Sequence, residues 1–120
     1  MGRIEKINQA VKREVSSIIH SELKDPHLEF ITITQVEVSR DLQHARVYFS
    51  VLGDKEKIAM GEQGLNRARG FVRKLIGQRI RMRFTPEIEF IYDRSVEYSM
   101  RIEEALEELK NEPGRDHQHD

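Results

Sequence analysis

Apolar side chains recur every three or four positions in the first part of the chain. This spacing places them on one face of an amphipathic helix. Asp25-Pro26 should end that helix, because proline disfavours α geometry in the residue before it. The apolar positions that define the face are Ile4, Ile7, Val11, Val15, Ile18, Ile19 and Leu23.

Two segments rich in β-branched residues follow the first helix. The first, "FITITQVEV" (30–38), and the second, "ARVYFSV" (45–51), both alternate apolar and polar residues, which is typical of strands. The short connection "SRDLQH" predicts an antiparallel hairpin. The alternation of the first segment changes parity after Ile33, so we expect a β-bulge near Thr34-Gln35.

The remainder of the chain predicts further helices and one more strand. Residues 55–83 carry an apolar stripe at helical spacing, and Thr85-Pro86 interrupts it. "EIEFIY" (87–92) is a short strand, and a last amphipathic helix begins near Asp93 and ends before Pro113-Gly114. The expected fold is α+β, with a three-stranded sheet covered by helices on one face.

Composition limits the possible classes of protein. The 120 residues suffice for one domain, which we place at 1–112, followed by a short disordered tail at 113–120. Cysteine is absent, which excludes disulfides and thiolate metal sites. The start of the chain has no apolar signal segment, and no apolar run approaches the roughly 18 residues of a membrane span. We therefore expect a cytoplasmic protein without a membrane partner.

The net charge is only −1, but the charges are segregated along the chain. No acidic residue occurs between Glu62 and Glu87. A helix that is merely solvated usually mixes charges of both signs, because opposite charges one turn apart stabilise it. Forked guanidinium groups suit phosphate, so the stretch indicates contact with nucleic acid. Its basic residues are Arg67, Arg69, Arg73, Lys74, Arg79, Arg81 and Arg83.

The glycines of this region allow two interpretations. Gly61-Glu62-Gln63-Gly64 has the GxxG spacing with which KH domains clamp an RNA backbone, but Glu62 would oppose a phosphate. A joint at Gly70 divides 55–83 into two helices of reasonable length and lies inside the basic stretch. We place the joint at Gly70 and interpret Gly61 and Gly64 as a loose first helix or loop.

Over about residues 4–110 the chain resembles the ribosome-binding factor A family, and three strings carry the resemblance: "SELKDPHLEFITITQVEVSRDLQHARVYFSVLGD", "LNRARGFVRKLIGQRIRMRFTPEIEFIYD" and "RIEEAL". The resemblance implies a type II KH-like fold in which a helix-kink-helix with Ala-x-Gly, here Ala68-Arg69-Gly70, replaces the GxxG turn. It also implies binding to the free small (30S) ribosomal subunit and its 16S rRNA. The implied role is late maturation, including processing of the RNA's 5′ end, and adaptation to cold.

The candidate sites follow from the charges and from the resemblance. We expect a monomeric, non-enzymatic RNA-binding protein without cofactor, metal, small-molecule substrate or catalytic residues. A protein-binding adaptor, a generic basic RNA-binding module and an RNA-cleaving enzyme remain alternatives. Among the strand aromatics, Tyr48 is the one expected to be exposed. The expected RNA-binding residues are Arg67, Ala68, Arg69, Gly70, Arg73, Lys74, Arg79, Arg81 and Arg83, with Lys6, Lys12, Arg13, Arg40, His44 and Arg46 as secondary candidates.

Overall fold

A computed structural model of the chain describes residues 2–111, except for the side chains of residues 96–102, 110 and 111. The expected tail at 113–120 lies outside the described residues. The elements are α1 (Arg3–Ser17), a π-helical turn (Ile18–Glu22), a 3-10 turn (Pro26–Leu28), β1 (Ile31–Val38), β2 (His44–Val51), α2 (Lys55–Arg79), β3 (Glu87–Tyr92) and α3 (Arg94–Asn111).

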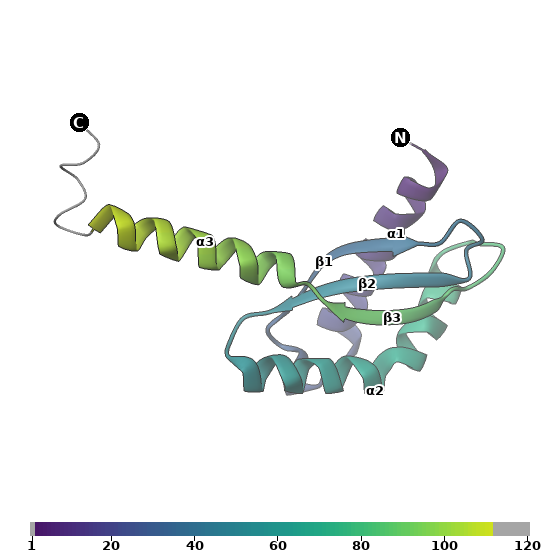
Figure 1. The fold of residues 1–120 in the computed structure, drawn as a ribbon. Helices are drawn as coiled ribbons and strands as arrows, with labels where there is room; N and C mark the ends of the chain where they lie inside the picture. Colours follow the sequence, from purple (N-terminus) through teal and green to yellow (C-terminus); the bar gives the residue numbers. More distant parts are fainter. Residues whose placement is uncertain (1, 112–120) are drawn as a thin grey trace.

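The three strands form one mixed sheet in the order β1-β2-β3 (Figure 1). β1 and β2 pair antiparallel, and their register shifts between Ile33 and Gln35, which confirms both the hairpin and the bulge. The bulge brings the apolar residues on both sides of it to the buried face of β1. β3 pairs parallel with β2, and α2 provides the long crossover that parallel neighbours require.

The core lies between one face of the sheet and the helices α1 and α2. Val11 and Val15 of α1 and Val72 of α2 are fully buried in it, together with Val47 and Phe49 of β2. The side chain of Phe49 meets the ring of Tyr92 edge to face, and Tyr48 is half-buried. Figure 1 shows α3 extending away from the end of the sheet. The expected α+β fold is therefore confirmed, with α1 and α2 on one face of the sheet.

α2 corrects the prediction of two separate helices. It is a single helix from Lys55 to Arg79, continuous through Gly70, although Figure 1 shows its direction changing along its length. A glycine inside a helix costs only about 1 kcal/mol relative to alanine. Leu65 before Gly70 and Ile76 after it are both buried in the same core, so packing keeps both halves helical. The helix also ends before residues 80–83, which were expected to belong to it.

The two earlier glycines of α2 also differ from expectation. Gly61 and Gly64 are helical and buried rather than part of a loose segment. A methyl group added at Gly61 would lie 3.2 Å from Val51, and one at Gly64 would lie 2.9 Å from Leu28. Glycine therefore allows the first half of α2 to approach the sheet and the 3-10 turn closely. The GxxG spacing arises from packing, and its backbone is not available to clamp RNA.

Candidate nucleic-acid interface

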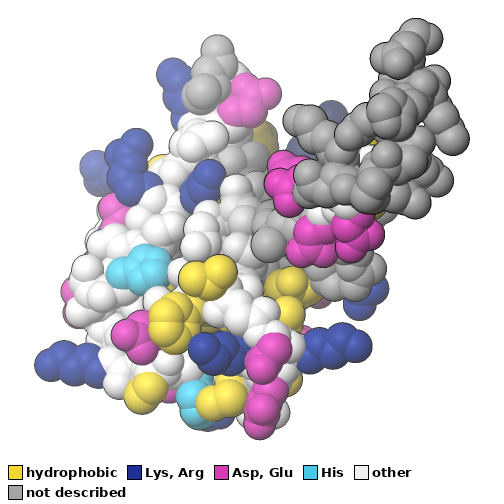
Figure 2. Space-filling model, turned by 90° about the vertical axis from the view of Figure 1, so that its left-hand side faces the viewer, with side chains coloured by type: hydrophobic (Ala, Val, Ile, Leu, Met, Phe, Trp, Pro, Cys, Tyr) yellow, Lys and Arg dark blue, Asp and Glu magenta, His cyan; other side chains and the backbone are white. Residues whose placement is uncertain are grey.

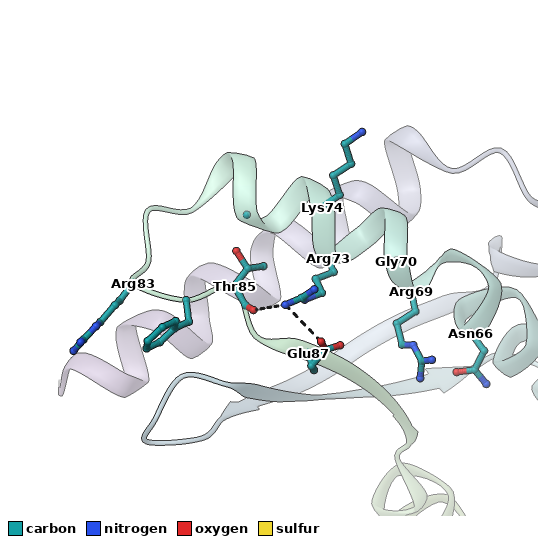
Figure 3. A pocket seen from close by; sticks show the side chains of 10 residues that line it. Asn66, Arg69, Gly70, Arg73, Lys74, Arg83, Thr85 and Glu87 are labelled. Carbon is teal, nitrogen blue, oxygen red and sulfur yellow. Dashed lines mark hydrogen bonds and ion pairs between the residues drawn. The ribbon is translucent and has the colours of Figure 1, made fainter.

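The second half of α2 and the segment that leads into β3 enclose an open groove of about 780 Å³ (Figure 3). The helix forms one side, and the segment 83–87 forms the other. Gly77 of α2 faces this segment closely, since an added methyl group would lie 2.8 Å from Oγ1 of Thr85. The residues that line the groove are Asn66, Arg69, Gly70, Arg73, Lys74, Gly77, Arg83, Phe84, Thr85 and Glu87.

Arg67 and Arg79 use their guanidinium groups within the protein. Arg67 donates to Oδ2 of Asp25 at 3.2 Å and lies 3.1 Å from Nδ1 of His27, which connects α2 to the 3-10 turn. Arg79 lies 3.4 Å from a carboxylate oxygen of Glu14 and 2.9 Å from one of Glu22. It therefore connects the end of α2 to α1 and to the π-helical turn.

Arg73 is also engaged, in this case with the far wall of the groove. Its Nε donates to the carbonyl oxygen of Pro86 at 3.1 Å, and its Nη2 donates to that of Thr85 at 3.0 Å. The same Nη2 lies 3.5 Å from Oε1 of Glu87. Figure 3 shows Arg73 pointing at this wall, whereas Lys74 points away from it.

The other basic residues of the stretch have no such partners in the part of the chain that the structure describes. Arg69, Lys74 and Arg81 are exposed, and none of them forms an ion pair with a described residue. Arg83 is exposed too, and its guanidinium carbon lies 5.3 Å from the centre of the Phe84 ring. These four uncompensated cations, Arg69, Lys74, Arg81 and Arg83, are the charges that a polyanion would meet first.

The Ala-x-Gly motif lies at this surface. Ala68 is partly buried against the core, while Gly70 is exposed, and apart from its chain neighbours and the backbone of its own helix no atom lies within 4 Å of the position its Cβ would occupy. The backbone at Gly70 is therefore open to a ligand. Glycine permits such an approach because it has no side chain.

The secondary candidates fall into different places. Lys6 and Arg13 are exposed on α1, and Lys12 is half-buried there. Arg40 lines a smaller groove together with Arg83, and Asp41 of the same β1–β2 loop lines it too, so the loop brings charges of both signs to this groove. The side chains of His44 and Arg46 are exposed on the sheet and line a different depression that they share with Glu37 and Glu89. Acidic groups offset the positive charge at that depression.

Two carboxyl groups near these elements have lowered pKa values. The backbone N–H of His27, which donates to Oδ1 of Asp25 at 2.9 Å, is the main cause of the lowered pKa of Asp25, and Arg67 lowers it further. The hydroxyl of Ser39 is the main cause of the lowered pKa of Asp41 in the β1–β2 loop. Each carboxylate is held by a local turn, so both order the connections rather than provide a reactive group.

Sequence reasoning missed Phe84 as a candidate for the interface. Its side chain is 44% exposed, and it lies at both the main groove and the smaller one. The signal in the sequence is an aromatic residue directly after three alternating basic positions and before the Thr85-Pro86 break. An aromatic in a basic loop is a candidate for stacking with a base.

The opposite end of α2 has a different surface. Figure 2 faces this end and shows hydrophobic side chains beside charges of both signs. Phe30, Leu52 and Met60 are its large exposed apolar residues, and the ammonium group of Lys57 lies 4.9 Å from the centre of the Phe30 ring. Charge of a single sign is therefore confined to the other half of the helix.

Comparison with known proteins identifies the family. Residues 3–106 match the family model described as Ribosome-binding factor A. The chain belongs to the ribosome-binding factor A family. A ribosome-binding factor A from Halothermothrix orenii is 46% identical over 114 residues, which are 95% of this chain and 93% of that protein. The resemblance to this family that the three strings indicated is thus confirmed.

Solved structures of the family share the fold. The crystal structure of ribosome-binding factor A from Thermus thermophilus superposes with a TM-score of 0.67 at 27% identity, over 77% of this chain and 97% of that one. A homology model of the Thermus thermophilus factor, fitted into a cryo-electron microscopy map of a 30S–RBFA complex, gives a TM-score of 0.60 at 29% identity and covers 72% and 91% of the two chains. These neighbours support the type II KH-like fold.

The described residues contain neither a cluster of metal ligands nor a membrane-spanning helix. No group of three or more His, Asp or Glu side chains within them is placed to hold a metal ion. No helix in the described part of the chain has the length and apolar character needed to cross a membrane.

Proposed function

We propose that this protein is a non-enzymatic assembly factor that binds the free small (30S) ribosomal subunit through its 16S rRNA. The observation that carries the proposal is its likeness to the Thermus thermophilus factor that was fitted into a map of a 30S–RBFA complex. The uncompensated cations beside the groove support an RNA surface on α2, because they would neutralise phosphates without first breaking an ion pair. The protein would bind as a monomer, in the cytoplasm where free subunits occur.

The proposed role in maturation depends on a difference in the protein's affinity for different conformations of the subunit's RNA. A protein that binds one conformation of the subunit's RNA more tightly than the others shifts the population towards it, without any chemical step. We propose that the protein acts in this way late in assembly, including the stage at which the 5′ end of 16S rRNA is processed. Such stabilisation would matter most in the cold, where misfolded RNA rearranges slowly, so the proposal includes adaptation to low temperature.

Co-sedimentation with isolated small subunits, large subunits and joined ribosomes across a salt series tests this function. We expect selective binding to free small subunits, with a log–log salt slope of roughly −3 to −5 if about four to six phosphates are neutralised. Equal binding to every particle would instead indicate a generic basic RNA-binding module. Association that is insensitive to salt and resists nuclease would indicate a protein-binding adaptor.

A cellular experiment tests the role in maturation separately. A strain that lacks the protein should accumulate precursor 16S rRNA with an unprocessed 5′ end, and more of it at low temperature than at high. Normal 5′ ends at both temperatures would refute this part of the proposal. Cleavage of precursor RNA by the purified protein alone would contradict the non-enzymatic assignment.

A further inference from the structure

Phe84 has an unusual position for a large apolar side chain. It is 44% exposed at the rim of the main groove, and the guanidinium group of Arg83 lies over its ring. An aromatic ring that is exposed beside cations offers a stacking face for any nucleobase, since every base has a π-face. The groove of about 780 Å³ is within the range of roughly 300–1,000 Å³ that is typical of clefts for small ligands.

The wall that carries Phe84 is held in place by Arg73. The two carbonyl oxygens that accept from Arg73 belong to Thr85 and Pro86, the residues immediately after Phe84. Thr85 belongs to the same wall, and Gly77 of α2 lies directly against it. Arg73 is therefore committed to this wall, and its guanidinium has the forked geometry that two adjacent carbonyl groups need. A lysine at this position would keep the charge but could not reproduce both hydrogen bonds.

Two of the uncompensated cations complete the arrangement. Arg69 and Lys74 line the same groove from the α2 side. Cations that can bind phosphates on one side and an aromatic face on the other suit an RNA strand whose bases are accessible. A duplex keeps its bases stacked inside the helix and cannot offer one to Phe84.

We propose that this groove binds an unpaired nucleotide of RNA, with its base stacked on Phe84 and the adjoining phosphates at Lys74 and Arg69. Arg73 is a positioning residue that holds the Phe84 wall rather than a phosphate ligand. This inference rests on the proposed function, because it specifies which part of the RNA the surface recognises.

The test is fluorescence anisotropy with a labelled single-stranded RNA ten-mer and with the same ten-mer annealed to its full complement as a blunt-ended duplex. The wild-type protein should bind the single strand more tightly than the duplex. Phe84→Leu should weaken single-strand binding about tenfold while leaving the salt slope and duplex binding unchanged, because stacking involves no counterion release. Phe84→Tyr keeps the ring and should bind like the wild type. Equal affinities of Phe84→Leu and wild type, or no single-strand binding by wild type, would overturn the proposal.

Arg73→Lys separates positioning from phosphate binding. The positioning role requires weaker single-strand binding with an unchanged salt slope, because the charge remains but the wall is released. A phosphate ligand would tolerate lysine, so wild-type affinity of Arg73→Lys would contradict the role given to Arg73. Lys74→Ala is the matched control and should make the salt slope shallower by about 0.7. Thermal melts of each variant verify that it is folded.

The same variants keep this inference distinct from the proposed function. Suppose that the wild type selects small subunits in co-sedimentation but Phe84→Leu binds the ten-mer as well as the wild type does. The stacking of a nucleotide on Phe84 is then refuted, and the assembly role stands. If the wild type does not bind small subunits, the assembly role itself fails, whatever the ten-mer shows.

Discussion

The two halves of α2 share a helical backbone but differ in the surface that they present to solvent. In the first half, glycine occurs where the helix touches other elements, as at Gly64 against Leu28. In the second half, Gly70 is open to solvent, and exposed cations stand near it. We therefore call the first half the anchoring half. The second half also packs, through Val72, Ile76 and Gly77, but it turns Gly70 and the uncompensated cations outward, so we call it the presenting half.

The arginines show the same division within the second half itself. Arg67, Arg73 and Arg79 are bound to the 3-10 turn, to the groove wall and to α1, respectively. Arg69 and Lys74 remain without an ion pair in the described part of the chain. The basic stretch is therefore not uniform. Roughly alternate cations hold the surface together, and the cations between them are available to a ligand.

The largest expected effect separates these two classes of cation. Arg69→Ala/Lys74→Ala should make the salt slope of small-subunit binding shallower by about 1.4–1.8, which weakens binding roughly 30-fold at 0.1 M salt. Arg67→Ala/Arg79→Ala removes as much charge but should leave the slope nearly unchanged, because those groups already have partners. Co-sedimentation of both double variants measures the difference. Equal losses of affinity in the two double variants would show that the paired and the uncompensated cations do not differ in their role.

The anchoring half is tested at its closest contact. Gly64→Val should lower the free energy of unfolding by about 1–3 kcal/mol, because the new side chain would overlap Leu28 in a filled core. The midpoint of thermal unfolding should fall by roughly 4–8 °C per kcal/mol for a domain of this size. Circular dichroism melts measure this shift, and an unchanged midpoint would mean that the 3-10 turn moves aside freely.

The matched substitution in the presenting half should act in the opposite direction. Gly70→Ala should raise the free energy of unfolding by about 0.5–1 kcal/mol, since alanine favours the helix and nothing occupies the space around it. The same melts measure it. A lower midpoint for Gly70→Ala would show that the bend in α2 depends on this glycine.

The smallest effect concerns the partner of Arg67. The pKa of Asp25 is lowered in the folded state, chiefly by the backbone N–H of His27, so its stabilising contribution is present above the unfolded pKa and is lost as pH falls through the folded value. The wild type should therefore melt slightly higher than Asp25→Asn at pH 7, and the gap should close as the pH drops below about 4. The effect is small because this surface pair is partly exposed. A gap that stays constant down to pH 3 would exclude the charge as its cause.

Much of the fold could be predicted because its signals are local. The parity change after Ile33 indicated the bulge, and the spacing of apolar residues in 4–23 indicated the buried face of the first helix. The difference between Gly64 and Gly70 could not be predicted in this way. Both occupy helical positions, and only the tertiary contact with Leu28 distinguishes them.

The candidate site was predictable in place but not in detail. Charge segregation identified the segment that lines the groove, because it can be read directly from neighbouring residues. The partners of Arg79 are Glu14 and Glu22, which lie far away in sequence, so no spacing rule assigns them. Arg73 bonds to backbone carbonyl oxygens, which no pattern of side chains can show. Phe84 was missed for a related reason: its exposure depends on how the wall is held.

Lysine footprinting on the bound small subunit shows which half of α2 meets the ribosome. Lys55 and Lys74 are both exposed on α2, one in each half. Acetylation of the free and the bound protein, read out by mass spectrometry, compares their reactivity. We expect small subunits to protect Lys74 strongly and to leave Lys55 reactive. Protection of Lys55 with Lys74 still reactive would contradict it, because the anchoring half would then be the one that meets the ribosome.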